Sequence, residues 1–355
     1  MSRAASTAPS ELVPEPASGA SPGLLPVAVL GAGSWGTALA IQFARAGHPT
    51  RLWGRDPAQR QQMERERCNA RYLPDAAFPE ALRVADTLDA ALEGARDLLI
   101  AVPSHALRAM LTELRPRLAP RLRLAWATKG FELDTGLLPH QVARAVLGAD
   151  VPIAVLSGPT FAREVGAGLP TAMVVASPDP EFATALATSL SSSNFRAYTS
   201  TDIVGVEVGG AVKNVMAVGA GLSDGLGFGA NTRIALITRG LVEMTRLGSA
   251  LGASRETFMG LAGLGDLVLT CTDDQSRNRR FGLALARGQD VATTLAAIGQ
   301  VVEGHLAARA VRAVAARHGV SMPIVEGIHR TLFEGVPARD VVRELMTRPI
   351  KSEFD

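Results

Sequence analysis

Residues 26–47 read PVAVLGAGSWGTALAIQFARAG, which is a short apolar run, a glycine-rich turn and then a segment of helical composition. In such a turn the first glycine, Gly31, makes the tight bend, and the second, Gly33, lets a pyrophosphate approach the backbone. The third, Gly36, permits close packing of the helix on the strand, and the phosphates bind at the helix N-terminus. The motif alone occurs by chance. Its position between a strand and a helix predicts a dinucleotide site rather than a glycine-rich turn without a ligand.

Further alternation of strands and helices predicts a doubly wound parallel sheet, and hence an α/β domain of the Rossmann type. We expect buried strands at 96–102, 123–127 and 152–156. Ligands bind beyond the carboxyl ends of the strands in such sheets, so Lys129 and the Gly158–Ala162 loop should converge on the cofactor crevice. His105 is assigned to the start of a helix rather than to a catalytic pair, because no partner for it is evident.

The second strand, residues 50–53, is followed by Gly54-Arg55-Asp56. An acidic residue at the end of this strand holds the ribose 2′-hydroxyl of NAD, whereas an arginine accommodates the 2′-phosphate of NADP. Arg55 therefore favours NADPH (NADP) as the preferred cofactor, and Asp56 leaves NADH (NAD) possible. A solvated loop charge is the alternative interpretation of Arg55.

The pattern changes along the chain. From about Val206 the strand signal gives way to long Ala- and Leu-rich segments, which predicts an all-helical domain. We divide the chain into a dinucleotide-binding domain at 26–205 and a helical substrate domain at 206–355. Residues 1–25 are rich in Ala, Ser and Pro and are predicted to form a disordered tail.

Composition argues against several classes of protein. A net charge of +2 over 355 residues is too balanced for a nucleic-acid or membrane surface. No window has the roughly 18 uninterrupted apolar residues that a membrane span needs. The two cysteines lack metal or disulfide spacing, which suits the reducing cytoplasm, and the six histidines form no HxxxH pair, so no metal is expected.

Lysine is scarce in this chain. Of 36 basic residues only three are lysine, at 129, 213 and 351. A compact ammonium can lose its proton near neutral pH, which a guanidinium effectively never does. Lys213 shares a helix face with Gly209 and Gly210, where burial would favour the neutral amine, so it is a candidate acid and base. The alternative is a buried lysine paired with a carboxylate such as Asp266.

The segment at 262–280 places an acid, hydroxyl groups and an arginine cluster close together. Arginine side chains bind phosphate through two parallel hydrogen bonds, so this segment is the predicted binding site of an anionic substrate. Its neighbours Ser276 and Asn278 single out Arg277, although any one arginine could equally be a surface charge.

Six segments in order resemble the bacterial-type NAD(P)-dependent sn-glycerol-3-phosphate dehydrogenase family: GAGSWGTALA, ATKG, SGPTFARE, GVEVGGAVKNVMAVGAG, AGLGDLVLTCTDDQSRNRRFG and QVVEG. The resemblance runs from Val27 to about Glu353. It implies a Rossmann domain followed by a helical domain similar to that of 6-phosphogluconate dehydrogenase. It also implies reversible reduction of dihydroxyacetone phosphate to sn-glycerol 3-phosphate for phospholipid biosynthesis. We expect a cytoplasmic homodimer, although the sequence itself does not give the oligomeric state.

The same resemblance assigns site residues. Lys213 is the expected proton donor and acceptor, with Asp266 and Asn214 orienting its amine. Expected cofactor contacts are Gly31, Gly33, Ser34, Trp35, Gly36, Arg55, Lys129, Ala162, Arg277, Val301 and Glu303. Expected substrate contacts are Lys129, Gly158, Thr160, Lys213, Asp266, Ser276, Arg277 and Asn278.

Two other functions stay open on the sequence. One is a dehydrogenase of the β-hydroxyacid or 6-phosphogluconate kind, which also uses a lysine on a helix. The adjacent pairs Lys213-Asn214 and Arg277-Asn278 argue against it. The other is an NADP-sensing module without enzymatic activity. Such a module would tolerate loss of Lys213, which this lysine-poor chain retains.

Overall fold

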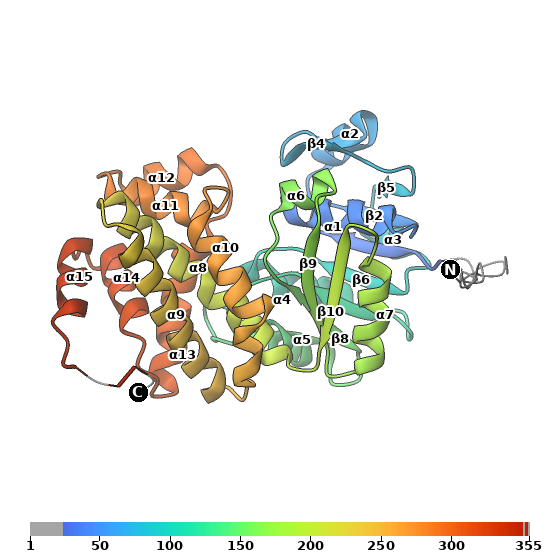
Figure 1. Ribbon diagram of the computed structural model, residues 1–355. Coiled ribbons are helices and arrows are strands. Elements are labelled where there is room, and N and C mark those ends of the chain that lie inside the picture. The colour runs from blue at the N-terminus through green and yellow to red at the C-terminus, as the bar shows by residue number, and fades with distance from the viewer. Residues whose placement is uncertain (1–23, 351, 354–355) are drawn as a thin grey trace, which may run out of the picture.

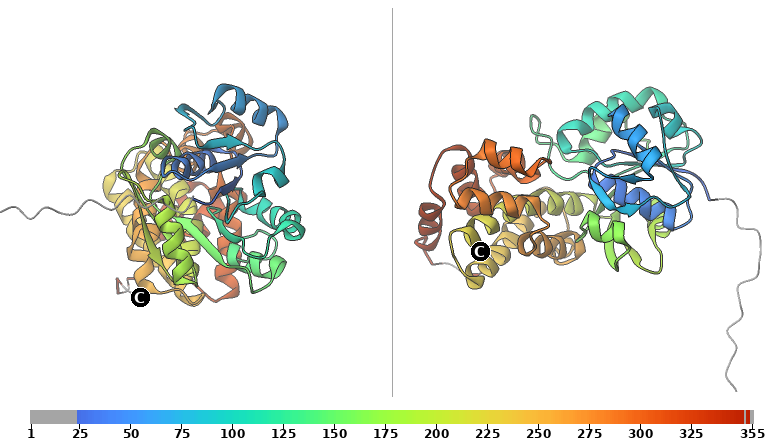
Figure 2. Two further views of the ribbon diagram at one scale, coloured as in Figure 1. Left: turned by 90° about the vertical axis from the view of Figure 1, so that its right-hand side faces the viewer. Right: turned by 90° about the horizontal axis from the view of Figure 1, so that it is seen from above.

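The computed structural model describes residues 24–350 and 352–353, which form two lobes side by side (Figures 1 and 2). The first lobe is built on an eight-stranded sheet, and the second consists of helices. The predicted disordered tail lies outside the described residues, apart from Leu24 and Leu25. The first helix of the second lobe begins at Ile203, close to the predicted division at 206, and the domain boundaries themselves stay a prediction.

The strand order of the sheet is β10-β9-β8-β7-β6-β1-β2-β5. Strand β1 lies between β2 and β6, and the chain reverses its direction of winding there. All neighbouring strands are parallel except β8 and β9. The predicted doubly wound α/β sheet is therefore confirmed, with an antiparallel step that the sequence did not reveal. The strands are β1 (Val27–Leu30), β2 (Thr50–Trp53), β5 (Leu82–Val84), β6 (Asp97–Ile100), β7 (Arg123–Trp126), β8 (Ile153–Ser157), β9 (Thr171–Ala176) and β10 (Phe195–Ser200).

Helices cover both faces of this sheet, and a two-stranded hairpin adds to the first lobe (Figure 1). Helix α1 begins at Ser34, inside the glycine-rich motif, and Gly33 is its N-cap residue. The remaining elements of the lobe are α1 (Ser34–Arg45), α2 (Pro57–Glu66), β3 (Cys68–Asn69), β4 (Leu73–Ala77), α3 (Leu88–Leu92), α4 (Ser104–Leu114), η1 (Arg115–Arg117), α5 (Pro139–Leu147), α6 (Ala162–Ala167) and α7 (Pro180–Leu190).

The glycines of the first turn have the conformations that their proposed roles need. Gly31 has a φ of +115°, and a Cβ there would collide with the carbonyl oxygen of Ala101. A Cβ at Gly36 would collide with the carbonyl oxygen of Gly31, so helix and turn are in backbone contact. Gly33 faces open space, since a Cβ added to it would meet no atom of the described residues within 4 Å. Two glycines are thus needed for packing and the third leaves room for a ligand.

The second lobe is arranged around α8, a helix of 23 residues that is buried over most of its length. By length and composition α8 could cross a membrane, but 94% of its apolar window is buried inside the protein, as in a core helix. The helical elements of this lobe are α8 (Ile203–Gly225), α9 (Ala230–Ala250), η2 (Arg255–Met259), η3 (Leu261–Gly265), α10 (Asp266–Thr272), α11 (Arg277–Ala286), α12 (Val291–Ile298), α13 (Glu303–Arg317), α14 (Pro323–Phe333) and α15 (Ala338–Met346).

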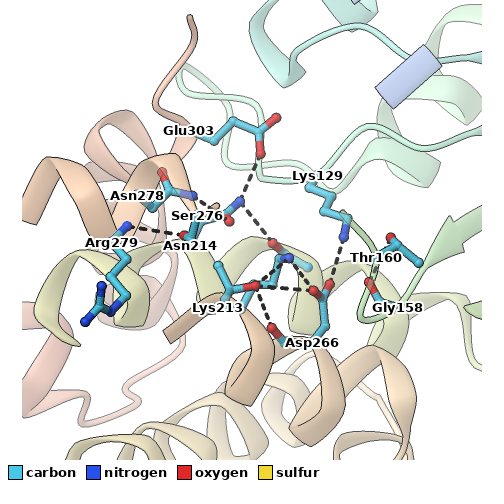
Figure 3. A network of polar contacts seen from close by, with 12 residues as sticks. Lys129, Gly158, Thr160, Lys213, Asn214, Asp266, Ser276, Asn278, Arg279 and Glu303 are labelled. Carbon is cyan, nitrogen blue, oxygen red and sulfur yellow. Dashed lines mark hydrogen bonds and ion pairs between the residues drawn. The ribbon is translucent and has the colours of Figure 1, made fainter. Parts of the chain in front are cut away.

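Helix α11 packs directly on the backbone of α8. A Cβ at Gly221 would collide with the carbonyl oxygen of Arg279, and a Cβ at Gly282 would collide with that of Val218. Glycine therefore sets the distance between the two helices. The first turn of α11, which carries Arg277 and Asn278, is held beside the turn of α8 that carries Lys213 and Asn214 (Figure 3).

Candidate active site

A cavity of about 990 Å³ opens at the glycine-rich turn, where the C-terminal ends of β1 and β2 meet the N-terminus of α1. Both lobes contribute to its wall. From the expected cofactor contacts it is lined by Gly31, Gly33, Ser34, Trp35, Arg55, Arg277, Val301 and Glu303. The indole Nε1 of Trp35 is buried without a hydrogen-bond partner in the described part of the chain. The open approach at Gly33 and the size of the cavity fit a dinucleotide.

Two side-chain amides hold the glycine-rich turn from behind. Gln59 Nε2 donates to the carbonyl oxygen of Ala32 at 2.9 Å, and Asn69 Nδ2 donates to the same oxygen at 3.0 Å. Asn69 also donates to Thr37 Oγ1 at 2.8 Å and is fully buried. These bonds fix the direction in which the turn presents its N–H groups. Neither amide could be singled out from the sequence, because the hairpin that carries Asn69 is too short to show a pattern.

The two residues after β2 have different surroundings. Arg55 is exposed and lines the cavity. Asp56 caps α2, its Oδ1 accepting hydrogen bonds from the backbone N–H of Ala58 at 2.9 Å and of Gln59 at 3.4 Å. Because this carboxylate already serves the helix, Arg55 is the group free to meet a 2′-phosphate. His105 lies in the first turn of α4, as predicted, and also lines the cavity.

A second cavity, of about 560 Å³, adjoins the first. Ser34, Trp35, Arg277 and Glu303 line both, so a group bound in one would face the other. From the expected residues the second cavity is also lined by Lys129, Thr160, Ala162, Lys213, Ser276 and Asn278. Gly36, Gly158 and Asp266 are not among the residues that line either cavity, and their expected contacts stay predictions.

Lys129 and Lys213 meet on one carboxylate, that of Asp266 (Figure 3). Lys213 Nζ lies 2.5 Å from Asp266 Oδ1 and donates to Thr270 Oγ1 at 3.0 Å. Lys129 Nζ donates to Asp266 Oδ2 at 2.7 Å. The side chain of Asp266 is 1% exposed and those of the lysines 13% and 9%. The ion pair that was the alternative explanation for Lys213 is therefore present, and it lies directly under the cavity.

Burial changes the acidity of this cluster. It lowers the pKa of Lys213 from 10.5 to about 8, against the opposing charge of Asp266 and with the help of the neighbouring Lys129. Burial also raises the pKa of Asp266, but the two ammonium groups outweigh that effect and hold its pKa below the usual range. The cluster thus combines an ionised carboxylate with an amine that can gain or lose a proton near neutral pH.

Asn214 does not touch the amine of Lys213, so the expectation that it orients this amine is wrong. Its Nδ2 donates to Glu303 Oε2 at 2.9 Å, and its Oδ1 accepts from Asn278 Nδ2 at 2.9 Å. Consecutive residues on a helix point about 100° apart, so Asn214 faces α11 and α13 while Lys213 faces α10. Thr270 takes the orienting place that we assigned to Asn214.

The arginines of α11 have separate surroundings. Ser276 caps the helix, and its Oγ accepts a hydrogen bond from the backbone N–H of Arg279 at 3.2 Å. Arg277 donates to Gln300 Oε1 at 3.2 Å and lines both cavities. Arg279 turns away and pairs with Asp224 at 2.6 Å. Arg277 is thus the member of the cluster that reaches both the cofactor side and the substrate side.

Several cavity-lining residues were missed by the sequence analysis. Tyr72 and Gln300 line both cavities, and Arg71 lines the larger one. Gln300 opens the QVVEG segment but was not assigned a role, and Arg71 and Tyr72 belong to no motif that would single them out. Within residues 24–350 and 352–353, no three His, Cys, Asp or Glu side chains lie close enough together to hold a metal ion.

Comparisons with known proteins agree with this geometry. Models of the NAD-dependent glycerol-3-phosphate dehydrogenase N-terminus and C-terminus match residues 26–183 and 202–343. The chain is 57% identical to a glycerol-3-phosphate dehydrogenase (NAD(P)+) of Aeromonas hydrophila, over 92% of this chain and 98% of the relative. It is 56% identical to one of Yersinia pestis, over 92% and 97%. The crystal structure of a glycerol-3-phosphate dehydrogenase from Coxiella burnetii is similar, with a TM-score of 0.89, 48% identity and coverage of 92% and 100%.

Proposed function

The chain belongs to the NAD-dependent glycerol-3-phosphate dehydrogenase family, and we propose that Lys213 is the proton donor and acceptor of this enzyme. The predicted family, the oxidoreductase activity and the use of a nicotinamide cofactor are confirmed by the relatives. The reaction is the reversible reduction of dihydroxyacetone phosphate to sn-glycerol 3-phosphate. The observation that supports the role of Lys213 is its place on Asp266, beside Lys129 and at the junction of the two cavities.

The residues of the cluster have complementary tasks in this proposal. The bound nicotinamide cofactor supplies or accepts the hydride at C2 of the substrate. Lys213 donates a proton to the C2 oxygen during reduction and takes it back during oxidation. Asp266 and Thr270 hold its amine in place. Two ammonium groups on one carboxylate leave a net positive charge, which attracts the anionic substrate.

The phosphate of the substrate needs a separate anchor. We assign it to Arg277, whose only side-chain hydrogen bond among the described residues is the 3.2 Å contact with Gln300. Asn278 is already bonded to Asn214 and to the backbone N–H of Gly304 at 2.9 Å, so it can offer one N–H at most. Arginine provides a bidentate fork for phosphate, whereas the amide adds one bond that fixes the orientation.

The cofactor would be held by elements of both lobes. The N-terminus of α1 and the open turn at Gly33 suit the pyrophosphate, and Arg55 suits a 2′-phosphate. The capping role of Asp56 supports our preference for NADPH over NADH. Val301 and Glu303 close the cavity from the second lobe.

The proposed reaction is tested by initial rates with dihydroxyacetone phosphate and each reduced cofactor. A panel of β-hydroxyacids and 6-phosphogluconate, assayed with the oxidised cofactors, covers the other dehydrogenase classes. We expect turnover with the triose phosphate and preference for NADPH. Intact cofactor binding without any turnover at micromolar enzyme would instead indicate a sensing module.

The pH dependence of the two directions should be opposite. Reduction needs the ammonium form of Lys213, which is lost as the pH rises through its pKa of about 8. Oxidation needs the neutral amine, which is gained over the same range. Turnover at saturating substrate should therefore fall about tenfold per pH unit above the midpoint for reduction and rise through that midpoint for oxidation. Profiles that change in the same sense in both directions would contradict the assignment.

Arg55→Ala should weaken the binding of NADPH much more than that of NADH, since only NADPH carries the 2′-phosphate. A lost charge-assisted contact corresponds to about 1.5–3 kcal/mol, or about 10- to 100-fold in Kd. Fluorescence titration of each reduced cofactor measures the effect. Arg83→Ala, which removes an exposed arginine of β5 outside both cavities, is the control. Equal losses for the two cofactors would show that Arg55 does not discriminate between them.

We also propose that the protein is a cytoplasmic homodimer. Sedimentation velocity at micromolar enzyme tests the assembly, with a monomer as the contrary result.

A further inference from the structure

A buried carboxylate joins the two lobes close to the lysine cluster. Glu207 lies on α8 and is 3% exposed. Its Oε1 accepts hydrogen bonds from Trp126 Nε1 and from the backbone N–H of His140, both at 2.9 Å. His140 Nδ1 lies 2.6 Å from its Oε2. One side chain of the helical lobe therefore contacts two segments of the sheet lobe, and α5 lies on the side of that lobe that faces the helices (Figure 1).

Each end of this network leads to one of the two lysines. Trp126 is the last residue of β7, and Lys129 follows it in the loop. Glu207 and Lys213 lie on the same helix, less than two turns apart. The bond between Trp126 and Glu207 thus ties the strand that delivers Lys129 to the helix that delivers Lys213.

The lysines need such a constraint because their side chains are long and their amines must meet on one carboxylate. Their nitrogen atoms lie 2.7 and 2.5 Å from the two oxygens of Asp266, so a small shift of β7 against α8 would break one contact. Trp126 is fully buried, so its indole N–H has no water to replace a lost acceptor. Burial raises the pKa of Glu207, and the bonds from His140 and Trp126 oppose that rise.

We propose that Glu207 is a positioning residue, which fixes the end of β7 and the start of α5 on α8 so that Lys129 and Lys213 converge on Asp266. The inference rests on the proposed roles of the two lysines. Neither Glu207 nor Trp126 lines the substrate cavity, so Glu207 acts through the lysines and not on the substrate.

Two substitutions separate positioning from other roles. Glu207→Gln keeps an oxygen that can accept from Trp126 and from the backbone of His140. Glu207→Met has a similar shape and no such acceptor. We expect the turnover of Glu207→Gln to stay within about threefold of that of the unmodified enzyme. The turnover of Glu207→Met should fall about 10- to 100-fold, because a displacement of a catalytic group by about 1 Å can cost that much. The Kd of NADPH should stay unchanged in both, since Glu207 does not line the cofactor cavity.

Glu243→Met is the matched control for the loss of a buried acceptor. Glu243 is also 3% exposed, and it accepts hydrogen bonds from the backbone N–H of Ile324 at 2.7 Å and of Val325 at 3.2 Å, away from both cavities. The Glu243→Met substitution should lower the unfolding temperature while leaving the turnover of the folded enzyme unchanged. If Glu207→Met does not fold, Trp126→Phe, which removes a single donor, takes its place.

A double-mutant cycle with Lys129→Met tests whether Glu207 acts through Lys129. If Glu207 acts by placing Lys129 against Lys213, Glu207→Met should cost less than about threefold in turnover once Lys129 is already absent. Additive losses, or unchanged turnover in folded Glu207→Met, would overturn the proposal. The proposed catalytic role fails on a different result, which is near-normal turnover of folded Lys213→Arg.

Discussion

Lys213→Arg is expected to lower turnover by about 10²–10⁴-fold, the usual contribution of general acid–base catalysis, with cofactor affinity largely kept. Arginine keeps the positive charge but stays protonated at every working pH, so it cannot exchange a proton with the C2 oxygen. A planar guanidinium also cannot reproduce the contacts of the compact ammonium. Lys213 Nζ is already within hydrogen-bond distance of Asp266 and Thr270, and its side chain is 9% exposed. Steady-state kinetics and NADPH titration of the same preparation measure the two quantities.

Lys129→Arg is the comparison variant for this experiment. It makes the same exchange on the other oxygen of Asp266. In our proposal Lys129 contributes positive charge and does not transfer the proton. The turnover of Lys129→Arg should therefore fall less than that of Lys213→Arg. The reverse order would make Lys129 the proton donor. Turnover within a few-fold of the unmodified enzyme in folded Lys213→Arg would remove Lys213 from the reaction.

Asp266→Asn should reduce the turnover of the reduction at neutral pH by at least about 10²-fold and also destabilise the fold. The charge of Asp266 is what keeps the pKa of Lys213 as high as about 8, so its removal moves that pKa further down. The ammonium form needed for reduction is then lost at neutral pH, and the midpoint of the pH profile shifts to lower pH. Breaking a buried ion pair typically costs about 3–5 kcal/mol, so the unfolding temperature should fall as well.

Asp224→Asn controls for the loss of a buried counter-charge. Asp224 also lies between two cations, with Arg233 at 2.8 Å and Arg279 at 2.6 Å, and its side chain is 10% exposed. It lies outside both cavities. Asp224→Asn should destabilise the fold without moving the pH midpoint. A midpoint that is also unchanged in Asp266→Asn would mean that Lys213 does not set the profile.

The features predictable from the sequence are those that a short stretch of chain determines. The turn at Gly31, the strand at 50–53 and the loop position of Lys129 follow from local composition and were found where expected. The antiparallel pairing of β8 and β9 could not be predicted, because the direction of a strand depends on how the chain returns to the sheet.

The supporting contacts of the site were also beyond sequence analysis, for a related reason. Glu207 and its partners Trp126 and His140 lie 81 and 67 residues apart in the chain. Nothing in the local pattern tells which buried acceptor meets which donor across such separations. The predicted contact of the Asn214 side chain was wrong because the adjacent pair Lys213-Asn214 suggested a common target. The helix instead turns the two side chains towards different neighbours.

The contact between α8 and α11 constrains how this chain can evolve. The backbones touch at Gly221 and Gly282, so the spacing between the lysine of one helix and the arginine of the other is set by two positions that carry no side chain. The chain has arginine rather than lysine at nearly every basic position, a bias that surface charges tolerate. These two glycines allow no comparable exchange, since the smallest alternative, alanine, would already push the helices apart. Inactivating substitutions will thus arise at sites that take no part in the reaction.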